Sequence, residues 1–518
     1  MTIGMARGLL ALAFLAYLAV FAAFPPLQLQ DFPNHLARAQ VMADLLFNDG
    51  AEFGRNFQFH FQFVPYLLGD LLLTVLVQLT GLTAAGVIWA AVTFLSLPCA
   101  LAAYLRVKQT APDVTLLMLF TSLYLSTDTF FVLGFLEFKL SIALVLVALT
   151  VVELLRKRWS RGRFAIYAVV VVIAYFTHLA AVVFIGVAVG AAAVCRLVLQ
   201  MRQEPANRAA VIRVTLNREM ILLAPVLCML VWHFLAAVAY RQPQDIVAEA
   251  YNWGTFASKV SRLSWGFIRY NRSQDAYVVA TFAAFLMYCV SEKRFRFRID
   301  FVGPQVLEAL TLGLVFLGLY FILPFEQAEA SYIDVRALAV APLFVVFGLL
   351  SLPPRQPSAG SRLTLPAIAL ASAVACVNLG YLAVHFAKEN EWLAQYRAVV
   401  ANIPEQGAVL PVYTGRRTAN IYDHLHTASF AVIDRHALTP YLFTGDRGNP
   451  MKYFRYTNRP YTPDEFWYQS SLDRDVDWKE VARSYRFLLI LKPFMPDRIP
   501  VKTRTVAENS TAVLLAIE

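Results

Sequence analysis

The apolar run "GLLALAFLAYLAVFAAF" (residues 8–24) and the polar stretch "LQLQDFPNHLARAQ" (residues 27–40) that follows it decide the class of this protein. A segment of about 20 apolar residues crosses a bilayer. We expect the run to be a retained membrane anchor rather than a cleaved signal peptide, because many similar runs follow it. Just after it, Asp31 precedes His35 and Arg38, which are three residues apart. An acid and two basic side chains where the chain leaves the bilayer suggest a functional site.

The composition is that of a polytopic membrane protein. Of the 518 residues, 58% are hydrophobic and 15% are charged, and the mean hydropathy is +0.55. A soluble domain carries roughly a quarter charged residues. The net charge of +10 comes from short basic clusters between apolar runs. That placement is the orientation signal of membrane proteins, so we do not expect nucleic-acid binding.

The basic clusters also predict which loops face the cytoplasm. They begin at Arg106, Arg156, Arg196, Lys293 and Arg355, and consecutive clusters must be separated by an even number of crossings. The expected spans are residues 8–26, 84–105, 113–127, 130–150, 165–177, 179–195, 219–240, 276–291, 302–323, 333–350 and 364–387. About eleven membrane-spanning helices result.

One run, residues 66–80, would break this parity. It is short and contains Asp70, so we predict an interfacial or re-entrant helix that does not cross. The first loop and the C-terminal tail then lie on the same outer face. The expected domains are a transmembrane domain, residues 1–387, with an acidic outer loop at 28–83, and a small extracytoplasmic α/β domain, residues 388–518.

In the first outer loop, Asn34 is expected to be the N-cap of a helix beginning at His35. His35, Arg38 and Asp44 would face away from the apolar side of this helix, which would lie along the membrane surface. Asp31 would stand just before its first turn. Two interpretations remain open: an acid that only complements a helix end, or a general base beside cations that bind an anionic substrate.

Further polar groups fall on the same face. Asp128, Glu137 and Lys139 interrupt apolar sequence at the second outer turn, where ionisable residues are costly and face a cavity or each other. Glu137 and Lys139 can therefore be a simple ion pair at a helix end or part of a site.

Two later outer segments carry polar groups as well. His178 lies between two spans and is either a polar turn residue or a ligand of the substrate. Asp334 and Arg336 stand at the outer end of another span. An outward arginine runs against the positive-inside rule, so we expect Arg336 to pair with an acid or to bind an anion.

This order of features resembles the GT-C superfamily of integral-membrane glycosyltransferases, and within it the protein mannosyltransferase and aminoarabinose transferase branch. The resemblance implies that Asp31 is the base, that Glu137 is a second acid at the fourth span, and that His178 and Arg336 bind substrate. It implies transfer of a hexosyl or pentosyl group, with inversion, from a polyprenyl-phosphate donor to a hydroxyl of a glycan, lipid or protein. The first loop has Gln30-Asp31 where many members have paired acids; no cofactor is assigned, and a divalent metal stays open.

The chemistry of such a transfer needs these residue types. A hydroxyl is a poor nucleophile and requires a carboxylate within hydrogen-bond reach, and the departing lipid phosphate requires fixed cations. The candidate catalytic residues are Asp31, Glu137 and Asp128, and the candidate substrate-binding residues are His35, Arg38, Lys139, His178, Arg336 and Asp334. The expected location is the plasma (inner) membrane of a bacterium, with membrane lipids as further partners and a role in the cell envelope.

Two other functions compete with this one, a lipid-linked precursor transporter or flippase and a non-catalytic membrane scaffold. Transporters place charged residues at mid-membrane, whereas here they cluster at the outer boundary. In the tail, His424, His426 and His436 could form a metal set, but their spacing matches no zinc pattern. The sequence does not specify the sugar, the acceptor, the carrier or the oligomeric state.

Overall fold

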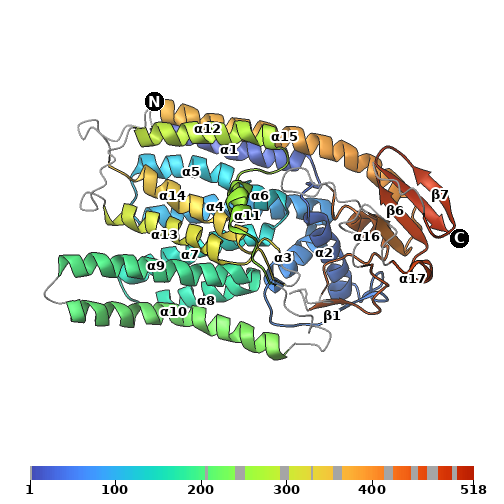
Figure 1. Cartoon of the computed structure of the whole chain (residues 1–518), viewed down its shortest axis with the longest axis horizontal. Helices are drawn as coiled ribbons and strands as arrows, with labels where there is room; N and C mark the ends of the chain where they lie inside the picture. Colours follow the sequence, from blue (N-terminus) through green and yellow to red (C-terminus); the bar gives the residue numbers. More distant parts are fainter. Residues whose placement is uncertain are drawn as a thin grey trace.

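The structure is a computed structural model that describes residues 3–204, 208–239, 251–291, 303–327, 331–353, 365–412, 424–444, 453–463, 476–492 and 499–518. A bundle of long helices forms most of the chain, and a smaller part with a β-sheet lies at one end of it (Figure 1). We call the end of the bundle that adjoins the β-sheet part the loop end. Arg241 and the basic clusters that begin at Lys293 and Arg355 lie outside the described residues.

The bundle contains a helix for each of the eleven predicted spans. They are α1 (Ile3–Ala23), α4 (Leu82–Val107), α5 (Pro112–Ser126), α7 (Leu136–Lys157), α8 (Arg161–Thr177), α9 (Leu179–Gln203), α10 (Arg208–Ala239), α12 (Arg272–Ser291), α13 (Pro304–Ile322), α14 (Ala341–Leu350) and α15 (Leu365–Val400). In the part of the chain described, nine helices are long and apolar enough to cross a membrane. The predicted span 130–150 is corrected at its start: α6 (Thr129–Val132) and a turn precede α7, because Asp128 caps a separate short helix.

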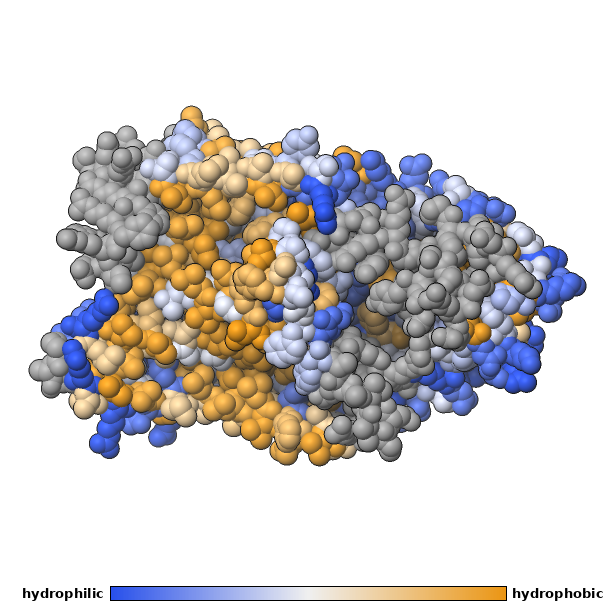
Figure 2. Space-filling model, in the orientation of Figure 1, coloured by the Kyte–Doolittle hydropathy of each residue, from blue (hydrophilic) through white to orange (hydrophobic). Residues whose placement is uncertain are grey.

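The remaining elements connect or cover these helices. They are α2 (Phe32–Phe47), β1 (Phe57–Phe59), α3 (Leu67–Thr80), β2 (Tyr251–Asn252), α11 (Phe256–Arg262), η3 (Leu263–Gly266), β3 (Glu326–Gln327), η5 (Val335–Ala339), β4 (Val409–Val412), α16 (Ser429–Arg435), β5 (Phe454–Tyr456), α17 (Trp478–Ser484), β6 (Phe487–Leu491), β7 (Thr503–Glu508) and β8 (Ala512–Ile517). Apolar side chains cover the helical bundle, and hydrophilic ones gather at both ends of the molecule (Figure 2).

A buried ion-pair network joins helix ends at the end of the bundle opposite the loop end. Lys108 Nζ, just after α4, lies 2.8 Å from Glu308 Oε1 near the start of α13 and 3.3 Å from Glu153 Oε2 near the end of α7. Arg156 Nη2 lies 2.7 Å from Glu219 Oε2 on α10. Helices α4 and α7 therefore end on one face, which is the face that the basic clusters assign to the cytoplasm.

Helix α3 is the run predicted not to cross. It has 14 residues and packs against α2 and α4. Asp70, in its first turn, contacts Arg38 on α2, which places α3 at the loop end. This arrangement is the one expected if residues 66–80 stay on one side of the membrane.

Helix α2 differs from its prediction. It begins at Phe32, so Asp31 rather than Asn34 occupies the N-cap position. His35, Arg38 and Asp44 are all buried, so the prediction that this polar side of the helix is left uncovered is wrong. The reason is that α3, α4 and α16 all pack against α2 and cover its polar side.

The C-terminal part confirms the expected small α/β region. Its four-stranded sheet has the order β4-β6-β8-β7, with β4 parallel to β6 and β8 antiparallel to both of its neighbours. Helix α15 has 36 residues and continues from the bundle into this part (Figure 1). The predicted boundary at residue 388 therefore falls inside one continuous helix.

The C-terminal part is attached to the first loop as well as to α15. Strand β1 pairs antiparallel with β5, with Phe57 opposite Tyr456, and α16 packs on α2. Two segments at opposite ends of the chain thus form a single layer over the loop end of the bundle.

Candidate functional site

Asp31 is held in place by a backbone contact between two loops. Its N–H donates to the carbonyl oxygen of Leu133 at 3.0 Å, next to a matching bond from Gln30 to Val132. Gly134 makes this approach possible: it has φ +81°, and a Cβ there would lie 2.7 Å from the backbone nitrogen of Phe32. Glycine has no Cβ and adopts a positive φ without a steric penalty, so the turn before α7 fixes the position of Asp31.

The carboxylate of Asp31 is not used as a helix cap. It makes no capping hydrogen bond to α2, and only 8% of the residue is exposed. Oδ1 accepts from Gln30 Nε2 at 3.0 Å and lies 3.4 Å from His426 Nε2. Burial raises the pKa of Asp31 to about 7, against the lowering effects of the Gln30 hydrogen bond and the Arg336 charge. A carboxyl group that titrates near neutral pH suits a general base.

Hydrogen-bond donors gather around Tyr66, at the start of α3. The His178 Nδ1 accepts from the backbone N–H of Ala180 at 3.1 Å, and burial lowers the pKa of His178, so its single proton is on Nε2. That Nε2 lies 3.3 Å from the Tyr66 hydroxyl and 3.3 Å from Arg336 Nη1. The Tyr66 oxygen accepts from His178, and Arg336 also donates to it. With two donors directed at its oxygen, the Tyr66 hydroxyl can donate its own hydrogen to an anion.

Arg336 is a cation without a carboxylate partner among the described residues. Nη2 lies 3.4 Å from the Ser331 carbonyl oxygen, and the buried Nε has no partner in the described part of the chain. The guanidinium carbon lies 5.5 Å from the centroid of the Phe135 ring and 5.7 Å from that of Phe138. Of the two options left by the sequence, binding an anion fits this environment and pairing with an acid does not.

Tyr66 also carries backbone strain. Its φ is +74°, a left-handed conformation that is unfavourable for a bulky residue. Such conformations cost on the order of 1–3 kcal/mol and cluster at functional sites. In this conformation the Tyr66 ring packs against the His178 imidazole, with centroids 4.8 Å apart.

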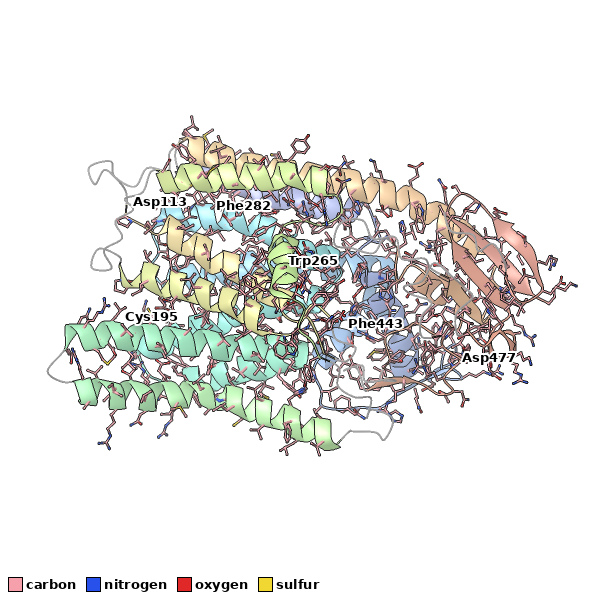
Figure 3. The ribbon with its side chains drawn as sticks, in the orientation of Figure 1. Asp113, Cys195, Trp265, Phe282, Phe443 and Asp477 are labelled. Carbon is pink, nitrogen blue, oxygen red and sulfur yellow. The ribbon has the colours of Figure 1, made fainter. Side chains whose placement is uncertain are left out.

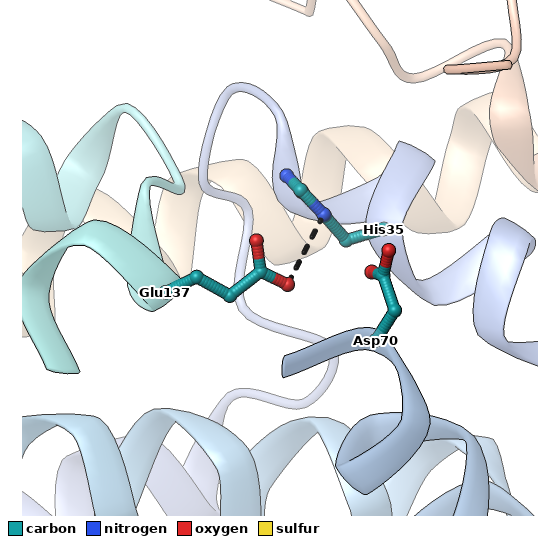
Figure 4. Close-up of side chains that lie close together, drawn as sticks. All are labelled: His35, Asp70 and Glu137. Atoms are coloured by element: carbon teal, nitrogen blue, oxygen red, sulfur yellow. Dashed lines mark ion pairs between the residues drawn. The ribbon is translucent and has the colours of Figure 1, made fainter. Parts of the chain in front are cut away.

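His35, Asp70 and Glu137 form a buried cluster (Figure 4). One ligand atom of each residue lies within 4.8 Å of the others, as a divalent metal would require. However, Arg38 donates to Asp70 Oδ1 and to His35 Nδ1 at 3.0 Å. The Arg38 guanidinium thus already supplies a positive charge to the cluster. It also donates to His35 Nδ1, which is the nitrogen that faces Glu137 and the one a metal ion would need. The cluster therefore does not fit a metal ion.

Three of the predicted site residues, Lys139, Asp128 and Asp334, form ion pairs with other side chains of the protein. Lys139 Nζ lies 2.8 Å from Asp128 Oδ2, while Asp128 Oδ1 accepts from two N–H groups of α6. Asp334 Oδ2 lies 3.2 Å from Lys259 Nζ. Of the two interpretations left open for Glu137 and Lys139, the simple ion pair between them is wrong, since Lys139 reaches back across the turn to Asp128.

The remaining predicted residues come together at the loop end. Asp31, His35 and Arg38 lie at the start of α2, Glu137 at the start of α7, His178 at the start of α9 and Arg336 on η5. The charges of Glu137 and Arg336 both act on Tyr66, and that of Arg336 also acts on Asp31. Segments from four separate parts of the chain thus surround one site.

Sequence reasoning missed Tyr66 and Asp70 and gave His426 a different role. The three tail histidines do not form a metal set, because each takes a separate partner. His424 lies 3.6 Å from Glu389, His426 3.4 Å from Asp31, and His436 3.0 Å from Glu52. Asp423, in the same stretch, lies outside the described residues. The three histidines are evident in the sequence, but only the tertiary structure shows that His426 is the one that lies close to Asp31.

Comparison with solved structures identifies the architecture. The chain superposes on the crystal structure of ArnT from Cupriavidus metallidurans bound to undecaprenyl phosphate, with a TM-score of 0.55, 11% identity and coverage of 100% of this chain and 98% of that one. The chain has the ArnT fold. The apo structure of the same ArnT gives a TM-score of 0.54, 12% identity and coverage of 99% and 98%. No family model matches the sequence, and a search of curated proteins gives no match.

The ArnT fold agrees with the architecture expected from the sequence, a bundle of membrane-spanning helices with a small C-terminal sheet region. Together with the nine long apolar helices, it makes this chain an integral membrane protein. At 11% identity the likeness covers the fold alone, so the roles of the site residues rest on the geometry described above.

Proposed function

We propose that this protein is a membrane glycosyltransferase. It transfers a hexosyl or pentosyl group from a polyprenyl-phosphate donor to an acceptor hydroxyl, with the loop end facing the extracytoplasmic side of a bacterial plasma membrane. The observation that carries this proposal is a set of hydrogen-bond donors on Arg336, His178 and Tyr66 beside Asp31. The carboxylate of Asp31 is buried and does not cap a helix. The ArnT complex with undecaprenyl phosphate supports a lipid phosphate as the ligand.

The transfer needs one proton movement and one displacement. Asp31 takes the proton of the acceptor hydroxyl as its oxygen forms a bond to the anomeric carbon of the sugar. The bond from that carbon to the phosphate oxygen breaks, and its electron pair goes to the lipid phosphate. Arg336, His178 and Tyr66 stabilise the growing negative charge in a partly dry site. A single displacement without a covalent intermediate inverts the anomeric configuration.

The competing functions fit the geometry less well. A transporter would hold its ionisable residues near the middle of the membrane, whereas Asp31, Tyr66 and Arg336 lie at or outside helix ends. A scaffold would have no use for a buried carboxylate that neither caps a helix nor joins an arginine or lysine pair.

The pH dependence of transfer tests the base. Because the pKa of Asp31 is raised to about 7, the carboxyl is protonated and inactive below that value. We expect kcat to rise about tenfold per pH unit up to about pH 7 and then to level off. Initial rates of transfer between roughly pH 5 and 9 would show this limb. A rate that stays flat across the range would contradict a base with this pKa.

Arg336→Ala tests the phosphate site. Loss of a charge-assisted hydrogen bond costs on the order of 1.5–3 kcal/mol, so we expect the affinity for undecaprenyl phosphate to fall roughly ten- to a hundredfold. Binding is measured by titration of the purified protein in detergent. Arg55→Ala is the matched control, because Arg55 is exposed in the first loop and should leave affinity unchanged. An Arg336→Ala protein that binds like the wild type would return Arg336 to a structural role.

A further inference from the structure

A buried asparagine joins the first loop to the C-terminal part. Asn34 is fully buried, its Oδ1 accepts from the backbone N–H of Phe443 at 2.8 Å, and its Nδ2 donates to the carbonyl oxygen of Tyr441 at 2.8 Å. A backbone N–H can only donate and a carbonyl can only accept, so these two partners fix which end of the Asn34 amide carries the hydrogens.

This fixed amide determines the protonation of His426. Asn34 Nδ2 lies 3.2 Å from His426 Nδ1, and its second hydrogen is available for that contact. His426 Nδ1 therefore accepts. Burial lowers the pKa of His426 to about 3, which keeps the imidazole neutral. Its one proton must then be on Nε2, which lies 3.4 Å from Asp31 Oδ1.

The surroundings hold the imidazole in this position. The Phe443 ring packs edge-on against His426, with centroids 4.7 Å apart. It also packs on His35 of α2, with centroids 5.5 Å apart, so it lies where the C-terminal part meets α2 (Figure 3). Among the described residues, the titratable and charged groups around Asp31 are His426 from the C-terminal part, Arg336 from η5 and His35 from α2, whose backbone N–H donates to the Asp31 carbonyl oxygen. Of these, His426 makes the closest described contact to the carboxylate.

We propose that His426 is a positioning residue for Asp31: its neutral imidazole donates the Nε2 hydrogen to Oδ1 and leaves Oδ2 to take the proton of the acceptor hydroxyl. This inference rests on the proposed function. The contact of 3.4 Å is longer than an ordinary hydrogen bond, and such contacts tighten when substrate is bound. The C-terminal part thereby completes the site that the first loop begins.

Two substitutions separate this role from packing. His426→Ala removes the donor, and because a hydrogen bond to the ionised carboxylate lowers its pKa, we expect the acid limb of the pH–rate profile to move up by about one pH unit. At pH values on that limb, kcat should be about tenfold lower than in the wild type, with KM for the lipid donor unchanged. His426→Gln keeps an N–H near the place of Nε2 and should restore most of both quantities.

His424→Ala is the matched control. His424 lies two residues away and stacks on Trp392, with centroids 3.6 Å apart, and its carboxylate partner is Glu389, not Asp31. Its profile should match that of the wild type. An unshifted profile in His426→Ala, or a His426→Gln protein as impaired as His426→Ala, would overturn the positioning role.

A readout without turnover separates this inference from the proposed function. The carboxyl band of Asp31, assigned by difference infrared spectra against Asp31→Asn, reports its titration directly. We expect His426→Ala to raise that titration by about one pH unit even if no sugar is transferred. An absence of transfer in the wild type with the infrared shift present would refute the glycosyltransferase and keep the His426–Asp31 contact. An infrared titration that does not move would refute the contact.

Discussion

Asp31→Asn should lower sugar transfer by about 10²–10⁴-fold while the protein still folds and inserts into the membrane. Asparagine has nearly the same size and can still accept from Gln30, but it cannot take the proton of an acceptor hydroxyl. Binding of undecaprenyl phosphate should persist, because the phosphate donors are on Arg336, His178 and Tyr66. Transfer from a polyprenyl-phosphate sugar and binding of the lipid alone are measured on the same preparations.

Asp49→Asn is the control for this experiment. Asp49 is exposed in the same loop and has φ +56°, a conformation that asparagine also tolerates. Asp44, which the sequence placed on a solvated face, is unsuitable because its Oδ2 accepts from two backbone N–H groups. Near-normal turnover in Asp31→Asn would leave Glu137 as the acid to test next, since Asp128 is engaged by Lys139.

Arg38→Met is expected to lower the free energy of unfolding by about 3–5 kcal/mol. Arg38 is fully buried and donates to both Asp70 and His35. Methionine fills similar volume but leaves Asp70 and Glu137 buried together without a cation. Thermal or denaturant unfolding of the purified protein in detergent measures the loss.

A second substitution should recover much of this loss. Asp70→Asn in the Arg38→Met background removes one of the two buried carboxylates that Arg38→Met leaves without a cation. The double variant should therefore be more stable than Arg38→Met alone. Arg55→Met, at an exposed position of the same loop, is the control and should change stability little. An Arg38→Met protein as stable as the wild type would mean that the acid cluster takes its compensating charge from elsewhere, such as a bound cation.

The sequence by itself determined the class, the spans and the composition of the site face. Each of the eleven predicted spans contains a helix, because hydropathy is a local property that a window of about 20 residues captures. Nine helices of the described residues are long and apolar enough to cross a membrane. The placement of Asp31, His178 and Arg336 on one face follows from counting crossings between basic clusters. These quantities depend on order along the chain and need no knowledge of contacts.

Only the tertiary structure decided which polar groups meet. The helix α2 looked amphipathic and therefore exposed, yet α3, α4 and α16 bury its polar side. Lys139 could pair with Glu137 or with Asp128, and the turn before α7 selected Asp128. Asn34 and His426 lie 392 residues apart in the sequence, and no periodicity links them. The partner of a buried charge depends on distances in the folded chain, because burial makes an unpaired group costly and only the packed neighbours can satisfy it.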